Sequence, residues 1–522
     1  MGSGIMTVLM ALLASGGGNE LLDYMQTEAY WKIKGVTVTA ETMQAELTPL
    51  TAGQIKALVG DLTGDDKAKG AAAATRLSSM GAAILPQLEK AAAAAQGKPE
   101  KAAAIQRLIG RVLASGQAGA VRRLMAIRAL GELKARPALG ALKGLLKSKT
   151  LFEADYAAAA IAAIEGKAYK RPGTSAKVLA TDVLRLPAGC GIAGQFRMPP
   201  GAPVDVAKLI KGVGQLPEGQ TSETLISQGT QMLLLAAEMV GNIRIDSVTL
   251  GVAGDMGRRA GFAVFIVRGK YDSKAVSALI GAQRRSKSET INGIEVLRPG
   301  GPPALMLPDN DMLVFCAGPS RGTLPLAEVT TAIKTGLGGL KGDSDLGKLI
   351  ATVDKSGPLW AAATITEAYA KDGGPMIAAF KTMTLKSKSV KGGQVITVTG
   401  KGSDAEAVAA AVKVFTGHIE GGKKETAREI DRGGPMAGMS KQMHAFLKTI
   451  KAQVDGASAT VTARLKGSPL MTLAPMLIMG GGRAAPKERR AIPENAPEPA
   501  PVEGKLDDPR PQRARPRAGV AE

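Results

Sequence analysis

The sequence predicts a multidomain protein with an all-α segment of helical repeats, then two α+β units, then a disordered tail. Three observations support this order. Apolar residues recur at helical spacing between positions 61 and 170, strand-like and helix-like stretches alternate from 176 to 480, and large apolar residues become rare at 481–522. The chain of 522 residues is also too long for one ordinary hydrophobic core.

Residues 1–18 have the pattern of a signal peptide. Positions 5–14 form an uncharged apolar run, and the small residues Ser15 to Gly18 follow it. Such a peptide would direct the protein to the periplasm or cell envelope. Because no Lys or Arg precedes the run, the alternative is a buried first helix in a cytoplasmic protein. Residues 19–60 are predicted to be a helical and extended segment.

Residues 61–170 carry the start and stop signals of paired helices. Gly64-Asp65-Asp66 offers a cap for a helix whose apolar stripe contains Ala73, Leu77 and Met80. Pro137 suits the first turn of a later helix, where its missing N–H is not needed. The other predicted stripe residues are Ile84, Leu85, Leu88, Ala126, Ala129, Leu130, Leu133, Leu139, Leu142 and Leu146, and Tyr156 to Ile164 open a further helix.

Two stretches of this segment resemble bacterial HEAT-like repeats. They are Ala73-Ala74-Thr75-Arg76-Leu77-Ser78-Ser79-Met80-Gly81 with Leu85-Pro86-Gln87-Leu88, and Ala126-Ile127-Arg128-Ala129-Leu130-Gly131-Glu132-Leu133 with Arg136-Pro137-Ala138-Leu139. The resemblance implies antiparallel helix pairs that stack side by side. It also implies a role as a scaffold, an adaptor or, in some cases, a nucleic-acid reader. It supplies no catalytic residue.

Residues 171–175 are predicted to be a linker to two α+β units at 176–330 and 331–480, each in the style of a ferredoxin-like fold. The first unit has predicted strands at 192–196, 243–251, 261–268 and 312–316, with Asp255-Met256-Gly257 as a hairpin turn. The second has predicted strands at 359–366, near 384, at 395–399 and at 459–465, and helices at 404–415 and 440–454. The remainder of the chain, beyond the repeats, is similar to bacterial α+β proteins.

The charge is strongly basic but spread out. The net charge is +21, of which residues 61–182 carry +10 and residues 331–482 carry +8. Trp31 and Trp360 are the two tryptophans, and no basic run has aromatic residues between its cations. Proteins that bind single-stranded nucleic acid usually combine basic grooves with aromatic stacking platforms. We therefore expect a solvated basic surface and no nucleic-acid partner.

Five arginines decide between the protein-binding and nucleic-acid-binding interpretations. A shared helical face for them would make a basic interaction surface and favour nucleic acid, whereas scattered positions would favour a protein partner. They are Arg107, Arg111, Arg122, Arg123 and Arg128.

Two cysteines are too few for a disulfide scaffold or a paired-cysteine metal site. Alternation places Cys190 on the same face of its strand as Ile192, Gly194 and Phe196. Cys316 ends the last strand of the same unit. If these strands were neighbours, as in a βαββαβ arrangement, the thiols would be close enough to form a disulfide. The alternative is two separate buried thiols.

The remaining candidate sites are better explained as turns and helices. Gly400-Lys401-Gly402-Ser403 lacks the first glycine of a phosphate-binding loop, because Val395 stands there. Asp309-Asn310-Asp311 is a turn or a weak cation site, and His418 and His444 have no nucleophile nearby in sequence.

We therefore predict no catalytic residue, no cofactor and no metal, and no segment that spans a membrane. The predicted function is that of an exported, non-catalytic scaffold that docks a protein or an envelope component. The alternatives are a basic cytoplasmic protein that associates with nucleic acid, and an enzyme whose site in the α+β half leaves no local motif.

Overall fold

The computed structural model describes residues 20–466 except positions 49, 79, 81–83, 115–116, 199–230, 232–233, 236, 255–260, 282–285, 300–302, 319–323, 341 and 434–436. The predicted signal peptide at 1–18, the turn at 255–257 and the predicted tail at 481–522 lie outside the described residues. Within the described residues, no helix is both long enough and apolar enough to cross a membrane.

The part of the chain before residue 170 is helical. Its elements are η1 (Leu21–Tyr24), α2 (Thr27–Ile33), α3 (Ala40–Leu47), α4 (Ala52–Leu62), α5 (Lys67–Ser78), α6 (Leu85–Ala94), α7 (Pro99–Ala114), α8 (Ala118–Glu132), η3 (Arg136–Ala138), α9 (Leu139–Leu145) and α10 (Glu153–Ile164).

Helices α4 to α7 pack in pairs around a small core of their own. Asp66, the last residue of the predicted cap, caps α5, because its side chain accepts hydrogen bonds from the backbone N–H groups of Ala68 and Lys69. Helix α4 contacts α5, and α6 contacts α7. Their shared core consists of Ile55, Leu77, Ile84, Leu88, Ala92, Ile105, Leu108, Ile109 and Val112.

Helix α8 is the central helix of the remaining group and is buried along most of its length. It contacts α2, α3 and α10. A Cβ atom at Gly131 would lie 2.8 Å from the Cα of Ala160, so glycine allows α8 and α10 to pack closely. Leu130 and Leu142 are buried as predicted, but Leu133 and Leu146 are exposed, because each follows the end of its helix.

The part after residue 176 is built on strands. They are β1 (Cys190–Arg197), β2 (Arg244–Ala253), β3 (Phe262–Lys270), β4 (Ser286–Ile291), β5 (Ile294–Pro299), β6 (Ala304–Met306), β7 (Met312–Ala317), β8 (Leu359–Thr364), β9 (Thr382–Val390), β10 (Gly393–Lys401), β11 (Lys451–Asp455) and β12 (Ser458–Lys466). The helices between them are α11 (Ala176–Leu184), α14 (Ser273–Gly281), α15 (Leu326–Thr335), α16 (Asp345–Thr352), α17 (Glu367–Ala378), α18 (Ala405–Arg432) and α19 (Ala437–Leu447).

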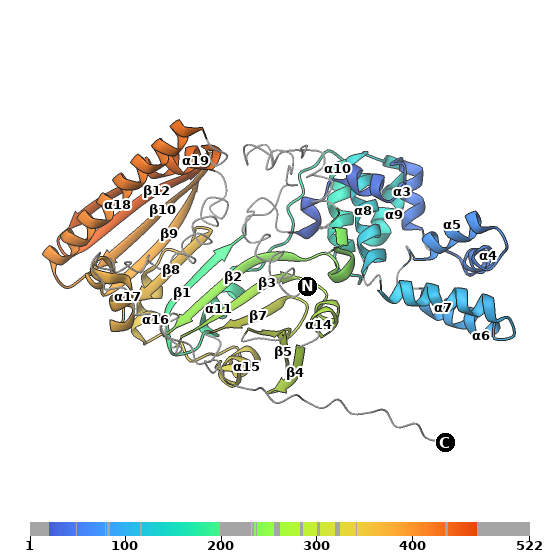
Figure 1. The fold of residues 1–522 in the computed structure, drawn as a ribbon, viewed down its shortest axis with the longest axis horizontal. Helices are drawn as coiled ribbons and strands as arrows, with labels where there is room; N and C mark the ends of the chain where they lie inside the picture. The colour runs from blue at the N-terminus through green and yellow to red at the C-terminus, as the bar shows by residue number, and fades with distance from the viewer. Residues whose placement is uncertain are drawn as a thin grey trace, which may run out of the picture. The chain divides into compact units, whose positions relative to one another are not determined.

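In the described residues these twelve strands form one antiparallel sheet, in the order β11-β12-β10-β9-β8-β1-β2-β3-β7-β6-β5-β4 (Figure 1). The two predicted α+β units are therefore two halves of one sheet, joined where β1 pairs with β8. We call β1–β7 the first sheet half and β8–β12 the second sheet half. The expected ferredoxin-like neighbour pair of first and last strands is not formed, because β2 and β3 lie between β1 and β7.

Both faces of the first sheet half are covered. One face packs against α11, α15 and α16 through Val183, Val329 and Ile350 among others. The other face shares a core with η1, α2, α3, α8, α9 and α10, so these helices and the sheet bury one common set of side chains. Val267 and Leu313 belong to that set.

One face of the second sheet half packs against α18 and α19, and α16 covers the other face at β8, where Trp360 is buried. Helices α18 and α19 lie along β12 and β10, where Ile396, Ala459 and Leu465 are buried with Val408 and Ala411 of α18 (Figure 1). Helix α18 is longer than the predicted 404–415. It contains His418, which was expected in a turn. Residues 451–454 were predicted as helix but form strand β11, paired with β12.

Candidate functional site: a buried charge network and an exposed basic sheet face

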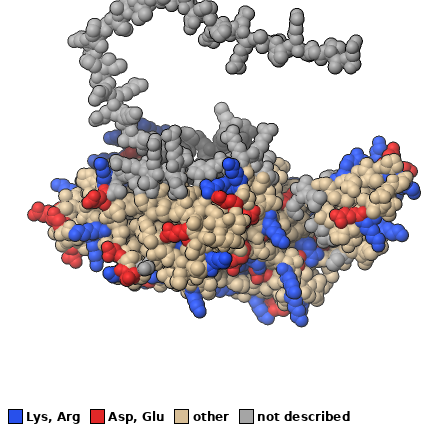
Figure 2. All heavy atoms as spheres, turned by 90° about the horizontal axis from the view of Figure 1, so that it is seen from below, with Lys and Arg blue, Asp and Glu red and all other residues tan. Residues whose placement is uncertain are grey.

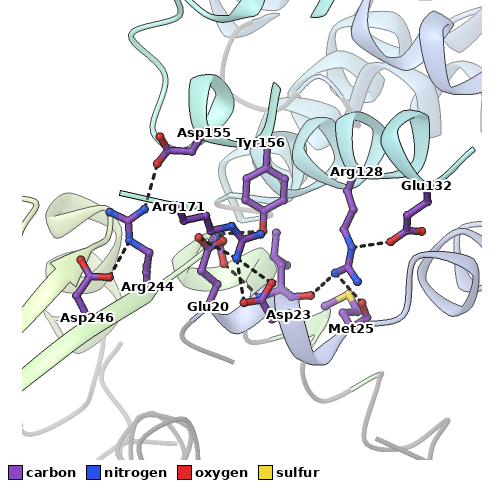
Figure 3. A network of polar contacts seen from close by, with 12 residues as sticks. Glu20, Asp23, Met25, Arg128, Glu132, Asp155, Tyr156, Arg171, Arg244 and Asp246 are labelled. Carbon is purple, nitrogen blue, oxygen red and sulfur yellow. Dashed lines mark hydrogen bonds and ion pairs between the residues drawn. The ribbon is translucent and has the colours of Figure 1, made fainter. Parts of the chain in front are cut away.

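A network of charged side chains is buried where the helices before residue 170 meet the sheet (Figure 3). Arg171, from the predicted linker, contacts two acids: Glu20, just before η1, and Asp23, within η1. Its Nη1 lies 3.3 Å from Glu20 Oε1 and 3.0 Å from Asp23 Oδ2. Asn242 donates a hydrogen bond of 2.8 Å to Glu20 Oε2. Glu20 and Asp23 are both buried.

A second group of ion pairs extends this network to the strands. Arg244 of β2 lies 3.1 Å from Asp155 of α10 and 3.2 Å from Asp246, and Lys270 of β3 lies 3.3 Å from Asp155 (Figure 3). Arg128 of α8 donates to the backbone carbonyls of Leu22 and Met25. The network therefore ties the N-terminal segment, α8 and α10 to the sheet.

Burial is the largest influence on the pKa values of Glu20 and Tyr156 in this network. Desolvation raises the pKa of Glu20 above its ordinary value, and the opposing attraction of Arg171 is the smaller effect. Burial also raises the pKa of the Tyr156 hydroxyl. Since Glu20 and Asp23 are enclosed by protein, the arrangement suits a structural joint.

Three of the five arginines, on α8, are paired with acids and do not contribute to a shared basic surface. Arg122 makes a two-point contact of 2.8 Å with Glu46 and lies over the Trp31 ring. Arg123 pairs with Glu153 at 2.7 Å, and Arg128 pairs with Glu132 at 2.9 Å. These three cations are used in internal contacts. Arg107 is exposed on α7, and Arg111 is in the same helix.

Of the two alternatives for Cys190 and Cys316, the structure has two separate buried thiols and no disulfide. Both thiols are free and buried on the same face of the sheet. They belong to β1 and β7, which are three strand spacings apart, or roughly 14 Å. That distance exceeds what a disulfide can span. Burial raises the pKa of each thiol to about 12.

The alternation expected around Cys190 is also wrong. A register shift between Cys190 and Ile192 puts Cys190 on the face of Ala193, while Phe196 packs on the opposite core.

The Asp309-Asn310-Asp311 stretch forms a turn. Asp309 Oδ1 accepts hydrogen bonds from the backbone N–H groups of Asp311 and Met312 at 2.9 and 2.8 Å. Asp311 pairs with Arg268 at 3.0 Å. The described residues contain no cluster of three His, Cys, Asp or Glu side chains that could hold a metal ion.

The second sheet half carries an exposed basic surface that sequence reasoning missed. On the side of the molecule that Figure 2 shows, Lys and Arg side chains lie among Asp and Glu side chains. Strand register reveals a different pattern on the sheet face opposite α18, which we call the basic sheet face. Its exposed cations are Lys386, Lys388, Lys401, Lys451 and Arg464. Between them lie Thr382, Thr384, Thr397, Thr399, Thr460 and Thr462, and the one acid among its strand residues is Asp455.

The cations of the basic sheet face are exposed, and Arg464 also donates a hydrogen bond of 3.1 Å to the backbone carbonyl of Lys391. None of the five forms an ion pair with another described residue, in contrast to the arginines of α8. The sequence did contain a signal for this face. Thr382, Thr384, Lys386 and Lys388 alternate with less polar residues, and Thr397, Thr399 and Lys401 repeat that period of two.

A cleft of about 280 Å³ opens on the basic sheet face, and we call it the Thr/Lys cleft. Strands β9 and β10 form its floor, and the end of α16 forms its wall. Its lining residues are Leu349, Thr352, Val353, Asp354, Thr382, Thr384, Lys386, Thr397, Thr399 and Lys401.

Comparisons with known proteins do not assign the chain to a family. No family model and no curated protein matches it. Among solved structures, crystal forms III, IV and I of TP0453 each align with a TM-score of 0.31 and 9–10% identity. The alignments cover 56% of this chain and 95–96% of TP0453.

Proposed function

We propose that this chain is a non-catalytic interaction protein that binds an acidic partner, either a protein or an envelope component, through the basic sheet face. The observation that carries the proposal is the set of five exposed cations on one sheet face, which form no ion pair with another described residue. Such a surface attracts anions over a distance set by ionic strength. The pairing of Arg122, Arg123 and Arg128 with acids argues against placing the binding surface on α8.

The helical part would then act as a scaffold. We propose that its pairs α4–α5 and α6–α7 are HEAT-like and offer a further docking surface for protein. The buried network and the common core support a fixed attachment of α8 and α10 to the sheet.

A protein or envelope partner fits the basic sheet face better than single-stranded nucleic acid does. Among its described residues, the face has no exposed aromatic ring for stacking bases. Trp360 lies opposite Lys386 in the strand register, but it is buried, and Lys355 lies over its ring.

We propose that the protein acts outside the cytoplasm. Support comes from the apolar run at 5–14 and from the small residues Ser15 to Gly18 that follow it. Cell fractionation combined with sequencing of the N-terminus of the isolated protein tests this. A cytoplasmic protein with an intact Met1 would contradict export.

Retention on immobilised heparin tests the binding surface. A triple variant, Lys386→Gln, Lys388→Gln and Lys401→Gln, should elute at clearly lower salt than the wild type, since each lost cation removes one contact with the polymer. The control is Lys413→Gln, Lys424→Gln and Lys441→Gln, which removes the same charge from exposed positions on α18 and α19. Equal losses in the two triple variants would refute the proposal.

A further inference from the structure

The floor of the Thr/Lys cleft is a regular grid of hydrogen-bond donors. In the strand register Thr384 lies opposite Thr399, Lys386 lies opposite Thr397, and Thr382 lies opposite Lys401. Four threonine hydroxyls thus occupy the floor, with a lysine at each of two diagonal corners. The hydroxyls of these four threonines make no hydrogen bond to another described residue, so their donors are available.

Hydroxyl and ammonium donors in this combination suit phosphate oxygens. Protein contacts to phosphate are made mostly by Lys, Arg, Ser and Thr side chains and by backbone N–H groups. Hydrogen bonds from a cation to an anion are roughly twice as strong as neutral ones. The floor therefore has the donor set for a phosphate group.

The wall of the cleft has the opposite character. It contains the carboxylate of Asp354 and the carboxyl end of α16 at Thr352, where backbone carbonyls lack helical partners. Asp354 is exposed, and Ser356 and the charges of Lys386 and Lys388 lower its pKa, so it is ionised at neutral pH. Acceptors of this kind repel a bare anion but accept hydrogen bonds from hydroxyl groups.

A ligand that matches both sides needs a phosphate group and neighbouring hydroxyls. We propose that the Thr/Lys cleft binds a phosphorylated polyol, with the phosphate on the lysine and threonine floor and the hydroxyls toward Asp354. Soluble glycerol phosphate and the headgroup of phosphatidylglycerol share this chemistry. The inference rests on the proposed function, because it names the ligand class that the basic sheet face recognises.

Calorimetric titration of the full chain with glycerol phosphate tests the phosphate part. Binding is expected, and Lys386→Gln with Lys401→Gln should weaken it by about tenfold or more, the range for charged hydrogen bonds. The paired change Lys413→Gln and Lys424→Gln should leave the affinity unchanged. A second variant, Thr384→Val with Thr399→Val, removes donors without a change in charge and should also weaken binding. No binding by the wild type, or equal weakening in the control, overturns the proposal.

The polyol part is tested by the preference for glycerol phosphate over inorganic phosphate. The wild type should prefer glycerol phosphate, and Asp354→Ala should reduce that preference, because the hydroxyl acceptor is lost while the repulsion of bare phosphate is relieved. Equal affinities in the wild type, or a preference that Asp354→Ala leaves unchanged, contradict the assignment.

Vesicles separate the two sources of this chemistry. Co-sedimentation with vesicles of phosphatidylcholine and phosphatidylglycerol in equal amounts, reversed by glycerol phosphate, identifies the lipid headgroup. Binding of glycerol phosphate without co-sedimentation identifies a soluble ligand or polymer. If heparin retention depends on the basic sheet face but glycerol phosphate does not bind, the phosphorylated-polyol inference fails and the proposed function stands. If the face-dependent retention is absent, the proposed function itself fails.

Discussion

At the scale of single residues, the joint between the helical part and the sheet depends most on Arg171. It is the cation that contacts both Glu20 and Asp23, and its guanidinium also lies 5.4 Å from the centre of the Tyr156 ring. Asp23 is 148 positions away in the chain. No local pattern in the sequence identifies such a partner, which is why a residue of the predicted linker turned out to be buried.

Replacement of Arg171 by Met should destabilise the protein by about 3–5 kcal/mol, because two buried carboxylates would lose their cation. Urea unfolding followed by circular dichroism measures the difference. Lys170→Met, at the exposed neighbouring position, is the control and should stay within about 0.5 kcal/mol of the wild type. Equal stabilities for the two variants would mean that the network does not hold the joint.

The raised pKa of Glu20 predicts how stability depends on pH. The unfolded chain loses the Glu20 proton near the ordinary value of 4.5, whereas the folded protein keeps it to a higher pH. Protonation therefore stabilises the folded state, and this contribution is lost as pH rises through the folded pKa. The free energy of unfolding of the wild type should fall over this range relative to Glu20→Gln. Parallel curves for the two proteins would contradict the assignment.

At the scale of elements, a helix cap and paired strands could be predicted from the sequence, but the ends of helices could not. The cap within residues 64–66 and the pairing of the strands at 243–251 and 261–268 were predicted correctly. Leu133 and Leu146 match the helical period, but the helices end just before them, so both side chains are exposed. Helix termini depend on backbone hydrogen bonds of the last turn, which the apolar period does not report.

The stripe of α8 gives a matched test. Leu130→Ala should lower the free energy of unfolding by about 2–5 kcal/mol, because it leaves a cavity in the core shared with the sheet. Leu133→Ala, at a side chain that is 44% exposed, should have a much smaller effect. Denaturant titrations of both variants measure this, and a larger loss for Leu133→Ala would contradict the described end of α8.

At the scale of the whole molecule, the sequence predicted two α+β units, whereas the structure has one sheet. Pairing of β1 with β8 joins strands more than 150 positions apart, and it places Gly194 opposite Ala361. Short side chains here allow close pairing, but the partner strand follows from the tertiary arrangement and not from either strand alone. The basic sheet face was missed for the same reason, since its threonines and lysines come from separate strands.

A fragment of residues 176–330, the first predicted unit, should not fold on its own. It lacks β8 and the helices that cover Ile245, Val267 and Leu313, so it would expose both an unpaired edge strand and an apolar face. Thermal melting should show no cooperative transition, while residues 20–466 should melt cooperatively. A sharp transition in the fragment would show that the first sheet half is independent.

Lysine footprinting tests the central claim, that the basic sheet face is the binding surface. The protein is acetylated with and without heparin, and the modification of each lysine is measured by mass spectrometry. The account predicts protection of Lys386, Lys388 and Lys401, with unchanged reactivity at Lys56 of α4 and Lys90 of α6, which are also exposed to solvent. Protection of the α4 and α6 lysines, with Lys386, Lys388 and Lys401 still reactive, would place binding on the helices and contradict the account.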